Sequence, residues 1–334
     1  MADKLAEIPF SVLDLAPIVQ GGSAADSFNR SVSLAKHAEQ LGYKRIWYAE
    51  HHNMENIASS ATVLLISHVA AHTKTIRVGS GGIMLPNHAP LIVAEQFGTL
   101  ETLYPGRIDL GLGRAPGTDQ LTSRALRRYM HSVDQFPSDV QELRDYLAIQ
   151  DGRMPVKAVP GIGTQVPIWL LGSSTFSAQL AASLGLPFAF ASHFAPTYLH
   201  EALRLYREQF IPSAQLEKPY VMACVNVMAA ETTTEAERLA TSFYQMARGI
   251  VTNERRPLQP PVDSMEGIWD EMEKAAVMQM MRYSFIGSAH EVHAGLENFV
   301  QQTGVDEIMA SSHIYDNKDR LRSYSLLAPM FKGV

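Results

Sequence analysis

The chain has 334 residues, and its content of 46% hydrophobic and 19% charged residues is ordinary for a soluble globular protein with a substantial core. A formal net charge of −6 gives no electrostatic basis for binding nucleic acid, which would require a basic stripe. The single cysteine, Cys224, excludes an internal disulfide framework, and no window approaches the about 18 consecutive apolar residues of a membrane span, so we expect a cytoplasmic protein without membrane contact.

Short apolar runs alternate with longer segments of helical period from one end of the chain to the other. In the first of these segments, apolar residues recur at spacings of three and four before a helix stop at Leu41-Gly42. The predicted strands cover residues 8–15, 45–50, 76–82, 107–113, 167–173, 187–192, 220–229 and 306–312. The predicted helices after the first cover residues 59–72, 91–103, 138–149, 177–184, 197–210, 234–248, 289–303 and 318–330.

Most of these strands are near-continuous apolar runs rather than alternating patterns, as in Ile168-Trp169-Leu170-Leu171. Runs of this kind are typical of parallel strands that are buried on both faces. Strands that alternate with helices form right-handed βαβ units, and eight such units in a chain of this size favour a closed barrel. The sequence therefore predicts an α/β fold, a single (β/α)₈ TIM barrel domain over residues 1–334.

Two segments interrupt this alternation. Residues 114–137 follow the fourth strand, and residues 249–275 precede the last β/α unit and contain Pro257, Pro260 and Pro261. Long insertions without a regular pattern are usually lids or disordered segments, and composition is compatible with either.

The clearest candidate site follows the fifth strand. Gly172 would let the backbone approach a ligand, and the hydroxyls of Ser173, Ser174, Thr175 and Ser177 gather at a predicted helix N-terminus. Unpaired N–H groups and the positive end of the helix dipole make this a phosphate site. The alternative is plain N-capping, which one hydroxyl would satisfy. Arg114, at the end of the neighbouring strand, would add a fixed charge.

Glu50-His51-His52 follows the second strand and admits three interpretations. Adjacent histidines on a strand point to opposite faces, so they do not naturally share one metal ion, and we predict no metal site. One histidine could be hydrogen-bonded in the barrel wall as a structural group. Alternatively, one could act as a catalytic acid or base with a near-neutral pKa, oriented by Glu50.

Several motifs, in order along nearly the whole chain, resemble the bacterial luciferase-like flavin monooxygenases. They are Trp47-Tyr-Ala-Glu-His-His-Asn53, Val78-Gly-Ser-Gly-Gly-Ile-Met-Leu-Pro86, Ala94-Glu-Gln-Phe97, Tyr104-Pro-Gly-Arg-Ile-Asp-Leu-Gly-Leu-Gly-Arg114, Leu171-Gly-Ser-Ser174 and Gly185-Leu-Pro187. The resemblance implies a TIM barrel that binds FMN without a covalent bond. It also implies that a separate flavin reductase supplies the reduced FMN, which then reacts with O₂ to oxygenate a small-molecule organic substrate.

The resemblance also implies roles for individual residues. His51 matches the catalytic histidine that follows the same glutamate, Glu50. Arg114 and Ser174 match residues beside the flavin phosphate, and Gly81-Gly82 matches a pair joined by a non-prolyl cis peptide near the flavin ring. The predicted helices 59–72 and 91–103 match those that pair luciferase subunits, so we expect a homodimer. The insertion 249–275 is the candidate lid that would exclude water.

Three departures from the luciferase pattern weigh against light emission from an aldehyde. Gly113 replaces a reactive cysteine, Ser173 replaces an acidic residue, and His193 stands where luciferase has an aromatic residue. Three alternatives stay open: a deazaflavin (F420)-dependent oxidoreductase, a non-catalytic flavin-binding protein, and a metal-dependent barrel hydrolase. The last would need clustered ligands on several strand ends, for which Asp14 and Asp109 are available.

Overall fold

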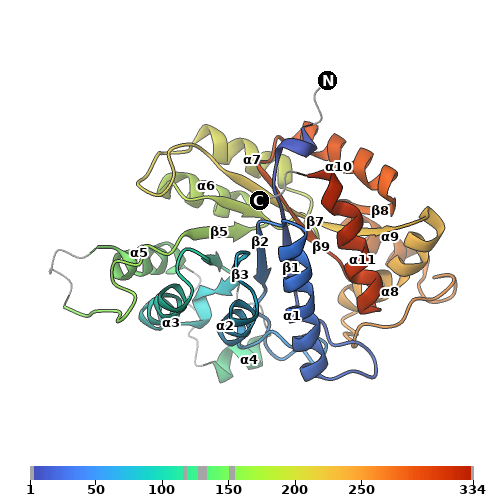
Figure 1. Ribbon diagram of the computed structural model, residues 1–334, viewed down its shortest axis with the longest axis horizontal. Helices are drawn as coiled ribbons and strands as arrows, with labels where there is room; N and C mark the ends of the chain where they lie inside the picture. The colour runs from blue at the N-terminus through green and yellow to red at the C-terminus, as the bar shows by residue number, and fades with distance from the viewer. Residues whose placement is uncertain (1–3, 116–118, 127–133, 150–154, 332–334) are drawn as a thin grey trace.

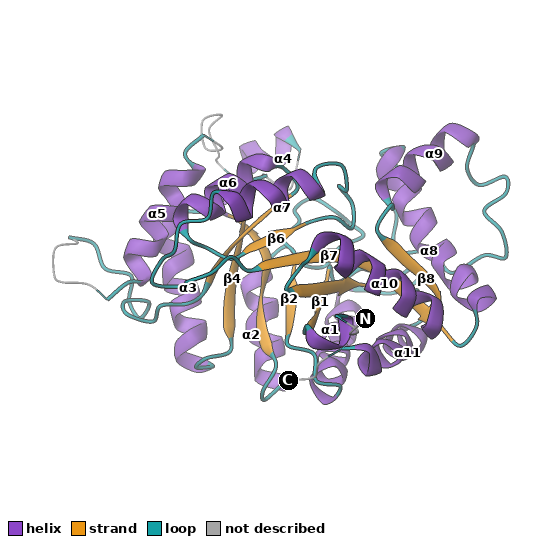
Figure 2. Cartoon of the chain, turned by 90° about the horizontal axis from the view of Figure 1, so that it is seen from above, coloured by secondary structure: helices purple, strands orange, loops and turns teal. Residues whose placement is uncertain are grey.

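Parallel strands lie at the centre of the molecule and helices surround them (Figures 1 and 2). The computed structural model describes residues 4–115, 119–126, 134–149 and 155–331. Parts of the predicted insertion 114–137 therefore lie outside the described residues. The strands are β1 (Phe10–Asp14), β2 (Arg45–Tyr48), β3 (Arg77–Met84), β4 (Ile108–Gly113), β5 (Ile168–Gly172), β6 (Phe188–Phe190), β7 (Val221–Ala230), β8 (Ser284–Ser288) and β9 (Glu307–Ser311).

Eight of these strands close into the predicted barrel. Strands β1 to β6 pair in chain order, β6 pairs with β7, and β9 closes the ring by pairing with both β7 and β1. All pairings are parallel, and every residue of β1, β2, β4, β7 and β9 is buried. Burial on both faces explains why these strands read as near-continuous apolar runs.

The ninth strand, β8, was not predicted. The ten-residue β7 pairs with β9 through its first half, Met222–Asn226, and with β8 through its second half, Asn226–Ala230. Only two of the five residues of β8 (Ser-Phe-Ile-Gly-Ser) are apolar, and β8 is half-exposed at most positions. A strand with so little apolar content carries no periodic signal, and the extended β7 supplies its pairing edge.

The helices cover the outside of the barrel (Figure 2). They are α1 (Ala24–Gln40), α2 (Thr62–His72), α3 (Pro90–Leu103), α4 (Gln120–Ala125), α5 (Phe136–Leu147), α6 (Thr175–Leu184), α7 (Leu199–Glu208), α8 (Thr233–Val251), α9 (Glu271–Met280), α10 (Ala289–Thr303) and α11 (Asn317–Leu327). The start of α1 is set by a capping box between Ser23 and Asp26, and α6 ends at Gly185 in the left-handed conformation. None of the described helices combines the length and apolar character that crossing a membrane requires.

The irregular part of the insertion 249–275 is shorter than predicted. Helix α8 continues to Val251 and α9 begins at Glu271, so the irregular connector covers 252–270. Helices α8 and α9 pack against each other beside the barrel (Figure 2). The connector is tied to the loop after β1, because the buried Leu258 donates its N–H to Ile18 and accepts one from Gln20, both at 2.8 Å. The segment therefore returns from α8 to the barrel.

Candidate active site

A cavity of about 580 Å³ opens among the residues that follow the barrel strands. Its volume lies in the range of small-molecule sites, and its position is where (β/α)₈ barrels hold theirs. Every predicted site residue except Glu50 lines this cavity. Those residues are His51, Gly81, Gly82, Arg114, Gly172, Ser173, Ser174 and Ser177.

One end of the cavity carries groups that could hold an anion. Ser174 is the N-cap of α6, yet its side chain makes no capping hydrogen bond, so the N-capping interpretation does not account for it. The first-turn N–H groups of α6 have no partner within the helix and can meet a ligand. The Arg114 guanidinium carbon lies 4.1 Å from the centre of the Phe176 ring, which holds this charge at the same end.

Gly172 lines the cavity and also lies close to the first turn of α6. A Cβ atom at Gly172 would lie 2.3 Å from the Ser177 Oγ atom. The missing side chain therefore makes room for Ser177 and lets the start of α6 lie close to the end of β5, and the predicted approach of a ligand to Gly172 stays a prediction.

Gly81 and Gly82 form a flat part of the cavity wall and are joined by a cis peptide bond, as the resemblance implied. A Cβ on Gly81 would lie 3.0 Å from side-chain atoms of both Leu13 and Trp47, and one on Gly82 would lie 2.8 Å from the Gly111 carbonyl oxygen. Larger residues would therefore push the wall into its neighbours.

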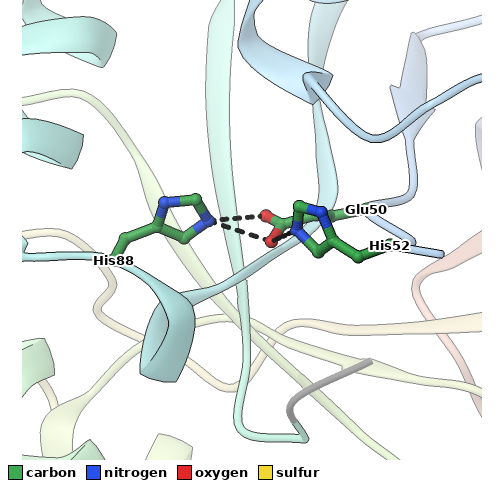
Figure 3. Close-up of side chains that lie close together, drawn as sticks. All are labelled: Glu50, His52 and His88. Atoms are coloured by element: carbon green, nitrogen blue, oxygen red, sulfur yellow. Dashed lines mark hydrogen bonds and ion pairs between the residues drawn. The ribbon is translucent and has the colours of Figure 1, made fainter. Parts of the chain in front are cut away.

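The buried Glu50 carboxylate is the centre of a hydrogen-bond network beside the cavity (Figure 3). His52 and His88 each approach Glu50 Oε1 through Nε2 at 2.9 Å, and the Met84 N–H donates to Oε2 at 3.1 Å. Burial alone would raise the pKa of Glu50, but the hydrogen bonds from the two histidines lower it to about 2. Glu50 thus ties the end of β2 to the loop after β3. The predicted contact between Glu50 and His51 is wrong.

Glu50, His52 and His88 also form a set of ligand types that a divalent metal ion accepts, with their atoms within 4.8 Å of one another. The hydrogen bonds to an ionised Glu50 already account for both ring orientations. The predicted separation of the adjacent histidines holds, because His51 lines the cavity while His52 contacts Glu50.

The His51 side chain lines the cavity, whereas Glu50 is hydrogen-bonded to His52 and His88. Its Nδ1 atom is buried and has no hydrogen-bond partner among the described residues. Burial lowers the pKa of His51 to about 4, and the nearby charge of Arg255 acts in the same direction. The near-neutral pKa predicted from the sequence is therefore wrong. At neutral pH His51 is an uncharged imidazole, which offers one proton donor and one acceptor.

Three further polar groups of the cavity wall were not predicted as site residues: His193, Asn226 and His313. Burial lowers the pKa of His193 to about 3 and that of His313 to about 4, so both are uncharged at neutral pH. In the described chain, Nδ1 of each histidine and Oδ1 of Asn226 lack hydrogen-bond partners. His313 could have been identified as a site residue, because it directly follows the last predicted strand. Asn226 could not, because it lies within an otherwise apolar strand.

The two aspartates considered as ligands of a metal-dependent hydrolase form ion pairs with arginines. Arg320 lies 2.9 Å from Asp14, and Asp109 forms ion pairs of 2.7 Å with Arg45 and 2.6 Å with Arg77. Both carboxylates are fully buried and neither lines the cavity. Asp109 joins strands of the barrel and Asp14 joins β1 to α11, so neither is available as a metal ligand.

Comparison with known proteins gives consistent family matches. A family model described as luciferase-like monooxygenase matches residues 8–307. A luciferase-like monooxygenase of Escherichia coli (strain K12) is 54% identical over 98% of this chain and 97% of its own length. An N-acetyl-S-alkylcysteine monooxygenase of Bacillus subtilis (strain 168) is 41% identical over 69% of this chain and 70% of its own length.

Solved structures share the fold. The crystal structure of apo-MsnO8 matches with a TM-score of 0.86 at 36% identity, covering 97% of this chain and 98% of that one. The oxygenating constituent of 3,6-diketocamphane monooxygenase of Pseudomonas putida, in complex with FMN, gives 0.74 at 17% identity, covering 96% and 97%. An F420-dependent secondary alcohol dehydrogenase gives 0.72 at 14% identity, covering 97% and 99%. The last two likenesses show the fold alone.

Proposed function

Because the chain belongs to the luciferase-like monooxygenase family, we propose that it is an FMN-dependent monooxygenase that uses O₂ to oxygenate a small organic substrate. The observation that carries this proposal is a single cavity that joins an anion site, a flat glycine wall and an uncharged histidine. Phosphate and a flat ring system are the two ends of FMN. The similarity to an N-acetyl-S-alkylcysteine monooxygenase supports a small organic molecule as the substrate that is oxygenated.

The residues present fit FMN. Arg114 and the α6 N-terminus, with Ser173, Ser174 and Ser177, would hold the phosphate, and Gly81-Gly82 would lie against the ring. When bound, reduced FMN from a separate flavin reductase would supply the electrons that activate O₂.

The protein's own groups would then control protons and water. His51 would accept a proton at Nδ1, which has no hydrogen-bond partner among the described residues, or donate one from its opposite ring nitrogen. Glu50 would act as a positioning residue, because it anchors the end of β3 through Met84 and the following segment through His88. The connector 252–270 contributes residues to the cavity mouth and would serve as the lid that excludes water.

An absorbance titration with FMN and with F420 tests the cofactor, and product analysis tests the reaction. We expect FMN to bind, and we expect protein, flavin reductase, NADH and O₂ to add one oxygen atom to a member of a panel that includes N-acetyl-S-methylcysteine. Binding of F420 in preference to FMN would instead support hydride transfer. FMN binding without oxygenation of any panel member would favour the non-catalytic flavin-binding protein.

The anion site predicts the effect of removing Arg114. Arg114→Met should weaken FMN binding by about tenfold or more, because a charge-assisted contact to phosphate is lost. Riboflavin, which lacks the phosphate, should bind the variant and the native protein equally. Fluorescence titrations of both ligands measure the ratio, and Arg124→Met on the exposed face of α4 is the matched control. Equal weakening of FMN and riboflavin would contradict a phosphate role.

We also propose that the protein is a homodimer that pairs through α2 and α3. Large apolar side chains are exposed on these helices, namely Leu64 at 72%, Leu103 at 59% and Ile92 at 45%. Leu64→Asp should raise the dimer dissociation constant by about tenfold or more, because a charge would be buried at the interface. Met272→Asp, at an 83% exposed position of α9, should leave it unchanged. Sedimentation of the native chain as a monomer at micromolar concentration would overturn the proposal.

A further inference from the structure

Three arginines of one segment stand at the mouth of the cavity. Arg248 lies near the end of α8, and Arg255 and Arg256 lie in the connector that follows. Arg248 is ion-paired with Glu273 at 2.9 Å and lies 3.9 Å from Glu254. Arg256 lies 3.7 Å from the same Glu254. These two guanidinium groups therefore have carboxylate partners within the protein.

Arg255 differs from its neighbours. Among the described residues, no carboxylate lies within ion-pair distance of it, and its Nη1 atom lies 3.1 Å from the Met54 Sδ atom. A thioether sulfur is a weak acceptor, so this contact leaves most of the hydrogen-bonding capacity of the guanidinium unused. The charge of Arg255 also acts on His51, where it helps to lower the pKa, which places the guanidinium on the same side of the cavity.

Apolar side chains line the cavity together with Arg255, which is itself exposed. They include Met54, which contacts the arginine, and Met246, Ile250, Ile268 and Met280. A cation at the wall of a cavity with flexible apolar side chains suits a molecule with a charged end and an apolar body. The planar fork of arginine matches a carboxylate with two parallel hydrogen bonds, which a lysine could not provide.

We propose that Arg255 binds the carboxylate of the organic substrate, and that the substrate class is therefore small organic acids with an apolar body. That the bound acid is the substrate rests on the proposed function, but the carboxylate site itself does not depend on FMN. Arg255 lies by Met54 and His51, whereas the predicted phosphate site is formed by Arg114 and α6. The cavity would thus hold one anionic group at each of two separate places.

Calorimetric titration with hexanoate and with hexanamide tests the site, because the two probes share an apolar chain and differ in charge. We expect hexanoate to bind the native protein about tenfold more tightly than hexanamide, since one charge-assisted pair is gained. Arg255→Gln should reduce this ratio to about one, and Arg256→Gln, the matched control at the next position, should keep it. Added sodium chloride should weaken hexanoate binding in the native protein and in Arg256→Gln, but not in Arg255→Gln.

Three outcomes would overturn the proposal: no preference for hexanoate in the native protein, an unchanged preference in Arg255→Gln, or an equal loss in Arg256→Gln. Thermal melting of both variants checks that they fold. FMN titration of Arg255→Gln separates the two proposals, because unchanged FMN affinity is expected and a loss would make Arg255 a cofactor ligand instead. If the native protein bound no FMN, the proposed function would fail, while the hexanoate titration of the FMN-free protein would still decide the carboxylate site.

Discussion

Replacing Arg45 with methionine is expected to lower the free energy of unfolding by about 3–5 kcal/mol, because two buried carboxylates would lose their shared cation. Arg45 is 4% exposed and lies 2.7 Å from Asp109 and 2.9 Å from Glu307. These three residues come from β2, β4 and β9, so the network ties together strands on different sides of the barrel. Urea denaturation followed by fluorescence measures the change.

Two comparisons separate this network from a general effect of losing an arginine. Arg204→Met removes an α7 arginine that is half-exposed and pairs with Glu201 and Glu208, and it should change the free energy of unfolding far less, because solvent screens exposed ion pairs. The double variant Arg45→Met with Glu307→Leu should recover part of the loss, because it removes a buried carboxylate that Arg45→Met would leave paired with Lys44 but without its arginine. Equal losses in Arg45→Met and Arg204→Met would contradict the network.

The same network predicts a direction for the pH dependence of stability. Burial alone would raise the pKa of Asp109, but the charges of Arg45 and Arg77 hold it below its usual range. A carboxyl with a lowered pKa in the folded state stabilises the protein above its unfolded pKa of about 3.9 and loses that contribution as the pH falls. The difference in the free energy of unfolding between the native protein and Arg45→Met should therefore be largest above about pH 4 and should narrow as the pH falls, which urea denaturation at a series of pH values measures.

The barrel could be predicted from the sequence because its strands are chemically unusual. A strand such as β7, buried at all ten positions, must be apolar nearly throughout, and this is visible without a structure. Strand β8 could not be predicted on that basis, because its pairing depends on the length of β7 rather than on its own residues. The helical ends of the insertion 249–275 were missed for a related reason, since α8 and α9 are stabilised by a second apolar cluster that they share with residues of β7 such as Met228.

The candidate site could be predicted in those parts where the geometry of strands and helices determines the positions of its residues. Residues after β4 and β5 reach the same end of the barrel, so Arg114 and Ser174 could be placed together. The prediction that Glu50 orients His51 is wrong, and the alternation of side chains along an extended chain already argued against it. Residues two apart share a face, and Glu50 indeed contacts His52. Arg255 was beyond prediction, because an irregular connector carries it to the cavity.

Replacing His51 with alanine is expected to reduce the rate of substrate oxygenation by about 10²–10⁴-fold, the range for losing a positioned acid–base group. FMN affinity should change less than about twofold, because the predicted phosphate contacts come from Arg114 and α6. Single-turnover product analysis and flavin titration measure the two quantities. His290→Ala on the exposed side of α10 is the matched control, and His52→Gln should have the smaller effect because its ring contacts Glu50.

The pH profile distinguishes an acid–base role for His51 from a structural one. With a pKa of about 4, the imidazole stays uncharged from pH 8 to about pH 5, and protonation should remove its acceptor only below that range. The ratio of product formed to flavin oxidised should therefore hold down to about pH 5 in the native protein and stay low at every pH in His51→Ala. A ratio that falls near pH 6.5 would mean that His51 titrates as an exposed histidine. Loss of FMN binding together with oxygenation would assign His51 to the cavity wall rather than to the reaction.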